Sequence, residues 1–529
     1  MRKLLFISIT FLTIAFMTAC SGSDDDDTSS LDNFNEEGDK IVDEKITLSM
    51  MGPSTPHQTI PWEEMKMFTV MEDKTNIAFE FSNPSSEGLE ESVNLAFGSN
   101  DLTDIMFGVN LTREQEAKYG AEGQLIPLED LIEDYAPNLK KILEDDSEVI
   151  RTITAADGHI YSLPFIDSEQ GFLSYQKLWI NQEWLDELNL DMPETVEDFQ
   201  EVLKAFKNQD PNGNGEADKF PLSADKDSYP SLHQVMLNAF GFTGLWDVAT
   251  EEVRYAPVEN DYKEYLAFMR GLYEEGLYDD EAFIQDAQQL NAKGDNGQLG
   301  VFYDAGPFLT VGMERNEEYV ALPPLTSSVN NEQMALRTPL VNTGVFAITQ
   351  ENKHPEATMR WIDYFYSDEG AIFMHYGIEG EDFKYIDDQQ GIERLTPEGM
   401  ERDEFISKLN PIGVTLPRTH DAVQKLMLHK QDETDPQDYY IMQETQKTTM
   451  PHAKPGFPNV HYKEDEIKTI NSIGTDIDDY VERMEAEFIT GKSSIEDDWD
   501  EYIETLEKMD VESYIDIHSD AYERWKSVD

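Results

Sequence analysis

Short apolar segments alternate with helical segments in the first patterned part of the chain. Residues 45–50 alternate polar and apolar side chains with a period of two, which predicts a strand. Residues 62–74 then predict a helix, and residues 76–82 predict a second strand. Because strand–helix–strand order is typical of parallel sheets covered by helices, the pattern indicates an α/β fold.

Amphipathic helices dominate the pattern further along the chain. The sequence Thr195-Val196-Glu197-Asp198 is typical of a helix start, because a hydroxyl and a carboxylate three residues apart can cap each other's backbone N–H groups. Apolar stripes with helical spacing follow at residues 199–206 and recur at 262–273, 355–365, 477–488 and 499–506. We interpret these stripes as core positions, since large apolar side chains are mostly buried.

Length and composition indicate more than one globular unit. The chain has 529 residues, of which 39% are hydrophobic and 11% aromatic, and this is ample for packed cores. Patterned sequence begins near Ile46 and leaves about 480 residues, enough for two or three units. Neither a repeat of fixed period nor a long linker divides them, so we expect domains joined by short crossings.

Charge narrows the range of partners. The 108 acidic and 40 basic side chains give a formal net charge of −68. A phosphate backbone would be repelled, so nucleic acid is excluded as a partner. Anionic lipid would be repelled as well. We interpret the charge as a solvated surface that keeps an exterior protein soluble, and a habitat of high salt or high pH is the alternative.

The N-terminus carries the features of a secretory signal. Residues 1–19 have a basic start, a short apolar run and small residues before Cys20, which is the only cysteine of the chain. The apolar run is shorter than the roughly 20 residues that span a bilayer. One interpretation is an ordinary signal peptide. The stretch also resembles the lipobox of bacterial lipoproteins, in which the cysteine bears the lipid, and residues 20–44 would then form a lipidated N-terminus and an acidic tether.

Seven phrases in a fixed order resemble one protein family. They lie at residues 95–105, 123–131, 157–164, 179–185, 272–277, 488–492 and 499–502. The family is that of the extracellular solute-binding proteins (family 1) of ABC importers, especially the lipoprotein type of Gram-positive bacteria. Within the first phrase, Thr103 replaces the proline that is usual in the family. The likeness extends from near residue 45 to near residue 525.

The resemblance implies a two-lobed periplasmic-binding-protein-like fold of type II, with a hinge that closes the lobes on a ligand. The first lobe is expected to combine residues 45–165 and 335–395, and the second lobe residues 166–334 and 396–529. A site between α/β lobes agrees with the tendency of such sheets to bind ligands at the carboxyl ends of their strands. The implied protein is a monomer, lipid-anchored at the outer face of the cell membrane, with the transmembrane subunits of an ABC permease as partners.

One loop matches a calcium site over most of its length. The oxygen ligands of an EF-hand loop at positions 1, 3, 5, 7 and 9 are matched by Asp210, Asn212, Asn214, Glu216 and Asp218. Pro221 stands where the closing glutamate is usual, and Lys219 stands where related proteins often have another acid. The alternatives are a structural Ca²⁺ site, which the resemblance favours, and an Asn/Gly-rich turn. No organic cofactor is expected.

Aromatic and polar residues in the expected loops are candidates for ligand contact, because sugars pack on aromatic faces and offer hydroxyls to polar side chains. The candidates are Trp62, Trp246, Tyr303, Asp304, Arg337, Tyr376 and Glu379. For each of them, packing in the core or a place on the solvated surface is the alternative. Together they favour an oligosaccharide over an amino acid or a metal ion.

Catalytic motifs are missing from the sequence. It contains neither Gly-x-Ser-x-Gly nor His-Glu-x-x-His, and no cysteine beyond Cys20. Glycoside hydrolysis needs only two carboxylates at a suitable separation. With 108 acidic side chains in the chain, the sequence does not exclude such a pair. We therefore predict a non-enzymatic, oligosaccharide-binding lipoprotein of an ABC importer. A peptide-binding lipoprotein and a secreted carbohydrate-active enzyme stay as alternatives.

Overall fold

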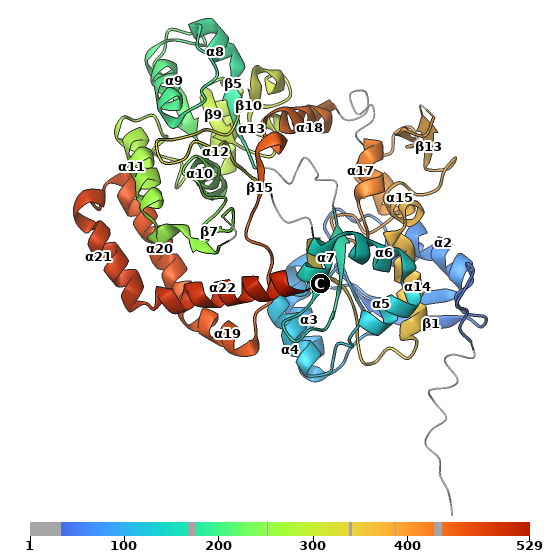
Figure 1. The fold of residues 1–529 in the computed structure, drawn as a ribbon. Helices are drawn as coiled ribbons and strands as arrows, with labels where there is room; N and C mark the ends of the chain where they lie inside the picture. The colour runs from blue at the N-terminus through green and yellow to red at the C-terminus, as the bar shows by residue number, and fades with distance from the viewer. Residues whose placement is uncertain are drawn as a thin grey trace, which may run out of the picture.

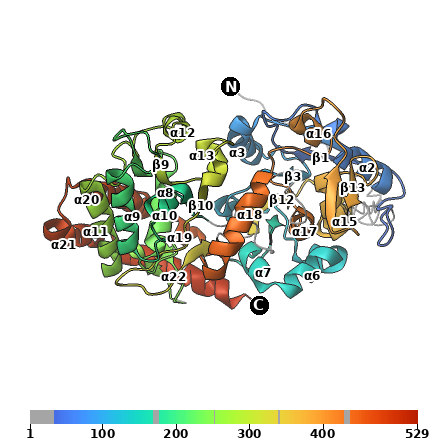
Figure 2. The same cartoon turned by 90° about the horizontal axis from the view of Figure 1, so that it is seen from above.

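Two separate β-sheets organise the chain into two α/β lobes that lie side by side (Figures 1 and 2). The computed structural model describes residues 33–167, 176–250, 252–337, 341–386, 388–427 and 436–528. The expected signal segment and Cys20 lie outside these ranges. The fold class predicted from the sequence is confirmed.

The first lobe is built on a five-stranded sheet with the strand order β2-β1-β3-β12-β4. Its strands are β1 (Ile46–Met51), β2 (Ile77–Ser82), β3 (Ile105–Phe107), β4 (Leu163–Ile166) and β12 (Val341–Ile348). Strand β1 pairs in parallel with β2 and β3, as the strand–helix–strand pattern predicts. Strand β12 comes from much later in the chain and pairs antiparallel with β3 and β4.

Helices cover this sheet and enclose an aromatic core. They are η1 (Trp62–Glu64), α2 (Lys66–Thr75), η2 (Ser86–Gly88), α3 (Leu89–Ser99), α4 (Arg113–Ala121), α5 (Glu129–Tyr135), α6 (Pro137–Asp145), α7 (Ser147–Ile153), α14 (Pro355–Asp363), η6 (Tyr364–Tyr366) and α15 (Asp368–Tyr376). Phe68 stacks on Trp62 with a centroid distance of 5.6 Å and lies parallel to Trp361 at 6.4 Å. These rings are buried and hold the helices against the sheet.

The second lobe is built on a four-stranded sheet with the order β10-β5-β9-β6. Its strands are β5 (Leu178–Asn181), β6 (Phe220–Ser223), β9 (Leu299–Tyr303) and β10 (Tyr319–Ala321), and a short ribbon is formed by β7 (Trp246–Asp247) and β8 (Arg254–Tyr255). Strands β6 and β9 are parallel, whereas β5 is antiparallel to both of its neighbours.

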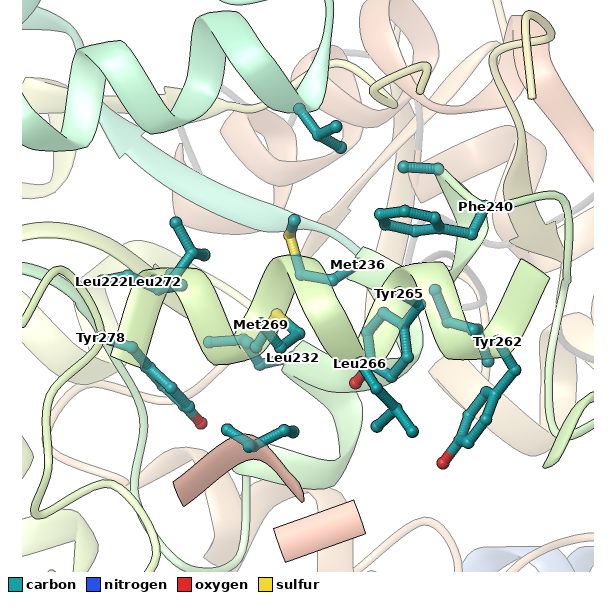
Figure 3. Close-up of a cluster of buried hydrophobic side chains, with 14 of the residues drawn as sticks. Leu222, Leu232, Met236, Phe240, Tyr262, Tyr265, Leu266, Met269, Leu272 and Tyr278 are labelled. Carbon is teal, nitrogen blue, oxygen red and sulfur yellow. The ribbon is translucent and has the colours of Figure 1, made fainter. Parts of the chain in front are cut away.

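Helices surround the second sheet and form the larger core. They are α8 (Gln182–Leu188), α9 (Val196–Asn208), α10 (Tyr229–Asn238), η4 (Ala256–Val258), α11 (Asn260–Glu274), α12 (Ala287–Asp295), α13 (Pro307–Val311), η5 (Asn316–Glu318), α18 (Pro436–Thr448), η7 (Met450–His452), α20 (Thr475–Thr490) and α21 (Ile495–Lys508). Figure 3 shows Leu266 and Met269 of α11 beside Leu232 and Met236 of α10. The apolar stripe at residues 262–273 is therefore core, as expected.

Two short strands and one long helix connect the lobes. Strand β11 (Ala335–Arg337) leads toward the first lobe and pairs in parallel with β15 (Ala453–Pro455). Beyond β15 follow α19 (Glu464–Thr469) and the π-helical turn η8 (Ile470–Gly474). Helix α22 (Val511–Ser527) runs from the second lobe to α7 of the first (Figure 1), where Trp525 Nε1 donates to Thr152 Oγ1 at 3.3 Å.

Two segments pack against the first lobe although they lie outside the residue ranges expected for it. Residues 33–44 belong to the expected tether, yet Ile41 and Val42 are buried in the apolar core of the first lobe, and their backbone N–H groups donate to Thr75 O. Residues 402–427 were expected in the second lobe, but Lys66 N of α2 donates to Lys408 O at 2.9 Å.

That second segment contains α16 (Arg402–Ser407) and α17 (Asp421–Met427), and it follows a hairpin of β13 (Phe383–Ile386) and β14 (Gly391–Arg394). All four elements therefore lie with the first lobe, where Figure 1 shows β13 and α17 and Figure 2 shows α16. No helix within the described ranges is long and apolar enough to cross a membrane.

Candidate functional site

A cavity of about 660 Å³ lies at the carboxyl end of β3, where the first lobe meets the chain that follows β15. Its lining comes from the turn after β3, from the start of β12, from the loop between α16 and α17, and from residues 457–462 after β15, which we call the crossing segment. The lining residues are Asn110, Leu111, Thr112, Arg113, Asn342, Thr343, Thr415, Phe457, Pro458, Asn459, Val460 and Tyr462. Amides, hydroxyls, one guanidinium and two aromatic rings thus share one space.

The turn after β3 is shaped by close backbone packing. Leu111 N donates to Gly344 O at 2.9 Å, and a side chain at Gly344 would collide with the backbone of Leu111. Gly344 also has a φ of 73°, which favours glycine. Thr112 then caps α4 in a capping box with Gln115, so that Arg113 becomes the first helical residue at the cavity wall.

The buried carboxyl group of Glu116 lies behind the cavity wall that α4 forms. Glu116 accepts a hydrogen bond from the Ser162 hydroxyl, and burial raises the pKa of Glu116 to about 7. Arg113 lies beside it, and burial lowers the pKa of Arg113 to about 10, so the guanidinium stays protonated at neutral pH. Its buried Nε atom has no hydrogen-bond partner among the described residues.

His461 fixes the crossing segment to the first lobe. Its Nε2 donates to the backbone oxygen of Thr152 at 3.1 Å and lies 3.9 Å from Glu116 Oε2. Burial lowers the pKa of His461 to about 3, so the ring is neutral and acts as a positioning residue. The neighbouring Tyr462 is thereby held at the cavity.

Phe457 connects the cavity to the second lobe. Its ring lies 5.9 Å from His518 of α22 and 6.0 Å from Trp246 of β7, centroid to centroid. Trp246 in turn stacks on His518 at 3.8 Å. Second-lobe aromatic rings therefore support the Phe457 ring at the cavity.

Two of the seven ligand candidates from the sequence belong to the core. Trp62 has no exposed surface and donates its Nε1–H to Gln58 Oε1 at 3.0 Å. Tyr376 is 5% exposed, and the Arg394 guanidinium lies over its ring at 4.5 Å. Neither side chain offers a face to a ligand in this arrangement.

Three other candidates serve local structure in the second lobe. Trp246 packs behind Phe457, as described above, and does not line the cavity. The Asp304 carboxylate accepts from the Thr310 hydroxyl at 2.6 Å, and burial raises its pKa. Tyr303 is half-buried against the core at the end of β9.

The last two candidates are also placed outside the cavity. Arg337 of β11 forms an ion pair with Glu148 of α7, with 3.1 Å between Nη2 and Oε2. Glu379 is exposed and bridges to Phe383 through the backbone. None of the seven is among the described residues that line the cavity.

Sequence reasoning missed Arg113, Phe457 and Tyr462. Two signals point to them. Arg113 follows a buried strand at its carboxyl end, where α/β sheets place ligands. Phe457 and Tyr462 lie in a Gly- and Pro-containing segment, which predicts a loop that carries aromatic rings.

The expected calcium loop closes around a lysine. The Lys219 ammonium lies 2.7 Å from Asn214 Oδ1, from Glu216 O and from Asp218 Oδ1. The Asp210 carboxylate is 3.2 Å from the same nitrogen. Among the residues that the structure describes, no group of three or more His, Cys, Asp and Glu side chains is placed to hold a metal ion.

Two α/β lobes joined by short crossings, with a polar and aromatic cavity beside one crossing, define a solute-binding protein. The chain belongs to the bacterial extracellular solute-binding proteins, since the sequence model of this family matches residues 61–372. The resemblance noted from the sequence is therefore confirmed.

Among curated proteins, the fructooligosaccharide ABC transporter substrate-binding protein FusA of Streptococcus pneumoniae is 30% identical over 97% of both chains. The solved structure of FusA with kestose is 29% identical, with a TM-score of 0.71 over 91% of this chain and 100% of that chain. An EF-hand mutant of FusA with fructo-nystose matches equally well. An HMO-binding, ABC-transporter-associated solute-binding protein of Bifidobacterium longum infantis shares the fold, with a TM-score of 0.75 and 18% identity over 91% of this chain and 99% of that chain.

Proposed function

We propose that this protein captures an oligosaccharide for import, as the substrate-binding component of an ABC transporter. The observation that carries the proposal is the cavity beside Phe457 and Tyr462, which combines aromatic faces with amide and hydroxyl groups. The similarity to FusA, which binds fructooligosaccharides, supports a fructose-containing oligosaccharide as the ligand.

In the proposed mechanism, Phe457 and Tyr462 pack on the C–H surfaces of the sugar. Asn110, Asn342 and Asn459 exchange hydrogen bonds with its hydroxyls, and the Arg113 guanidinium at the cavity wall donates to one of its oxygens. The lobes then close about the crossings and exclude water from the ligand. The closed shape is what the permease recognises, and the sugar is released unaltered.

The proposal places the protein outside the cell, held by a lipid on Cys20. The basic, apolar and small-residue pattern of residues 1–19 supports export and lipidation. The net charge of −68 disfavours adsorption on anionic lipid, so acyl chains would hold the protein at the membrane. The mechanism uses no metal ion at the calcium-like loop of residues 210–218, because the Lys219 ammonium contacts its ligand oxygens.

Isothermal titration calorimetry with kestose, nystose and a pool of short peptides tests the proposal. We expect the fructose oligomers to bind and the peptides not to bind. Replacing Tyr462 or Phe457 with Ala should weaken sugar binding about tenfold or more, which corresponds to about 1.4 kcal/mol.

The Glu379→Gln variant is the matched control, because Glu379 is exposed and does not line the cavity. Its affinity for sugar should equal that of the wild type. Peptide binding without sugar binding, or the release of reducing ends from the bound oligosaccharide, would overturn the proposal.

A further inference from the structure

The loop between α9 and β6 is organised around the ammonium group of Lys219. Four oxygen atoms surround this nitrogen: three at 2.7 Å and the Asp210 carboxylate at 3.2 Å. The Lys219 side chain is only 2% exposed, although the loop itself is at the surface. A lysine side chain this little exposed is uncommon, and here its charge is met by four oxygen acceptors.

The four acceptors are the groups that an EF-hand loop turns toward Ca²⁺. Asp210, Asn214 and Asp218 supply side-chain oxygens from positions 1, 5 and 9, and Glu216 supplies its carbonyl from position 7. Gly215 at position 6 has a φ of 74° and donates its N–H to Asp210 Oδ2 at 2.7 Å. The chain thus folds as a calcium loop folds, but it encloses its own cation.

Calcium does not fit this loop together with the lysine. Ca²⁺ needs six to eight oxygen ligands at about 2.3–2.6 Å, and four of those available already contact the ammonium. An ion among the same oxygens would lie within a few ångströms of a like charge, which is repulsive. Position 12, where a bidentate carboxylate normally closes the shell, is Pro221 and offers none.

The enclosed loop also ties two connections of the second lobe together. Asn212 Nδ2 donates to Gly297 O at 3.1 Å, and Gln298 Nε2 donates to Asp218 Oδ2 at 2.9 Å. Gln298 O in turn accepts from Phe220 N at the start of β6, at 2.8 Å. The loop therefore holds β6 in register beside β9, which is the task that a structural metal ion would have.

We propose that Lys219 is a covalently attached substitute for calcium, and that this loop is stable without any metal. In this respect the chain would differ from FusA, of which an EF-hand mutant has been solved. The substitution makes the fold of the second lobe independent of the calcium concentration outside the cell.

The first test is carried out on the full wild-type chain. Thermal unfolding is followed in EDTA and in about 1 mM CaCl₂, a concentration that fills extracellular calcium sites. We expect the same melting temperature in both, and no saturable signal when Tb³⁺ luminescence or calorimetry is used to detect binding. A melting temperature that falls in EDTA, or a stoichiometric calcium isotherm, would overturn the proposal.

The second test restores the metal. Lys219→Glu removes the ammonium and adds a carboxylate at position 10, so the variant should unfold earlier in EDTA and regain stability when CaCl₂ is added. Lys207→Glu is the control, because Lys207 is exposed on α9, where its ammonium donates to Glu275 O at 2.6 Å. It should show no calcium effect.

If Lys219→Glu binds calcium no better than the wild type, the idea that the ammonium occupies a metal position is wrong. A variant too unstable to study does not rescue the idea, because the wild-type measurement decides it alone.

Discussion

At the scale of single residues, Glu116 makes the stability of the first lobe depend on pH. Burial raises the pKa of Glu116 from 4.5 to about 7, so the folded state favours its neutral form. Below pH 4.5 the group is protonated in both the folded and the unfolded state, so it does not change the free energy of unfolding. Between pH 4.5 and 7 the unfolded state ionises first, and the free energy of unfolding falls as the pH rises, by about 3 kcal/mol in total.

The Glu116→Gln variant should remove this dependence. Its free energy of unfolding should exceed that of the wild type above pH 7 and approach it below pH 4.5. Urea denaturation at a series of pH values measures the difference, with Glu122→Gln as a control on an exposed carboxylate of the following turn. Equal pH profiles for wild type and Glu116→Gln would contradict the assignment.

Residue chemistry alone did not separate ligand contacts from core. Trp62 follows Pro61 in an expected loop, yet its ring lies 5.7 Å from Phe107 inside the first lobe. Phe457, which the sequence did not single out, lines the cavity. An aromatic ring suits a sugar and a core equally well, so the distinction needs the tertiary position of each residue.

At the scale of elements, local signals were sufficient where partners are close in sequence. The capping box at the start of α9 was predicted, and Thr195 Oγ1 accepts from Asp198 N at 3.0 Å while Asp198 Oδ2 accepts from Thr195 N at 3.2 Å. Strand β11 gave no such signal, because it has three residues and its partner β15 lies far along the chain. Pairing at that separation depends on the two lobes that enclose it.

The cap itself can be tested. Thr195→Ala removes the hydroxyl that accepts from Asp198 N, and the free energy of unfolding should fall by about 1 kcal/mol. Thr195→Ser keeps the hydroxyl and should lose much less. Urea denaturation of the three proteins compares them, and an equal loss in both variants would show that the methyl group, not the cap, matters.

At the scale of the whole molecule, the proposed closure of the two lobes about their crossings predicts a change in overall size. We expect saturating kestose to reduce the radius of gyration in small-angle scattering. Ligand at 100 times its Kd should also raise the free energy of unfolding by about 2.7 kcal/mol, because it binds only the folded state.

The Phe457→Ala variant provides the comparison, because a tenfold weaker affinity should lower the gain in the free energy of unfolding at the same sugar concentration from about 2.7 to about 1.4 kcal/mol. Tight binding without compaction would exclude closure as the mechanism while leaving capture intact.

Phe457 touches the cavity on one side and the rings of Trp246 and His518 on the other. A bound sugar that contacts Phe457 would therefore act directly on the contact between the crossing segment and the second lobe. The same ring would then influence both the choice of sugar and the closure of the lobes. Substitutions at residue 457 or 462 that adapt the protein to a new sugar should therefore change the closure equilibrium of the lobes as well as the ligand specificity.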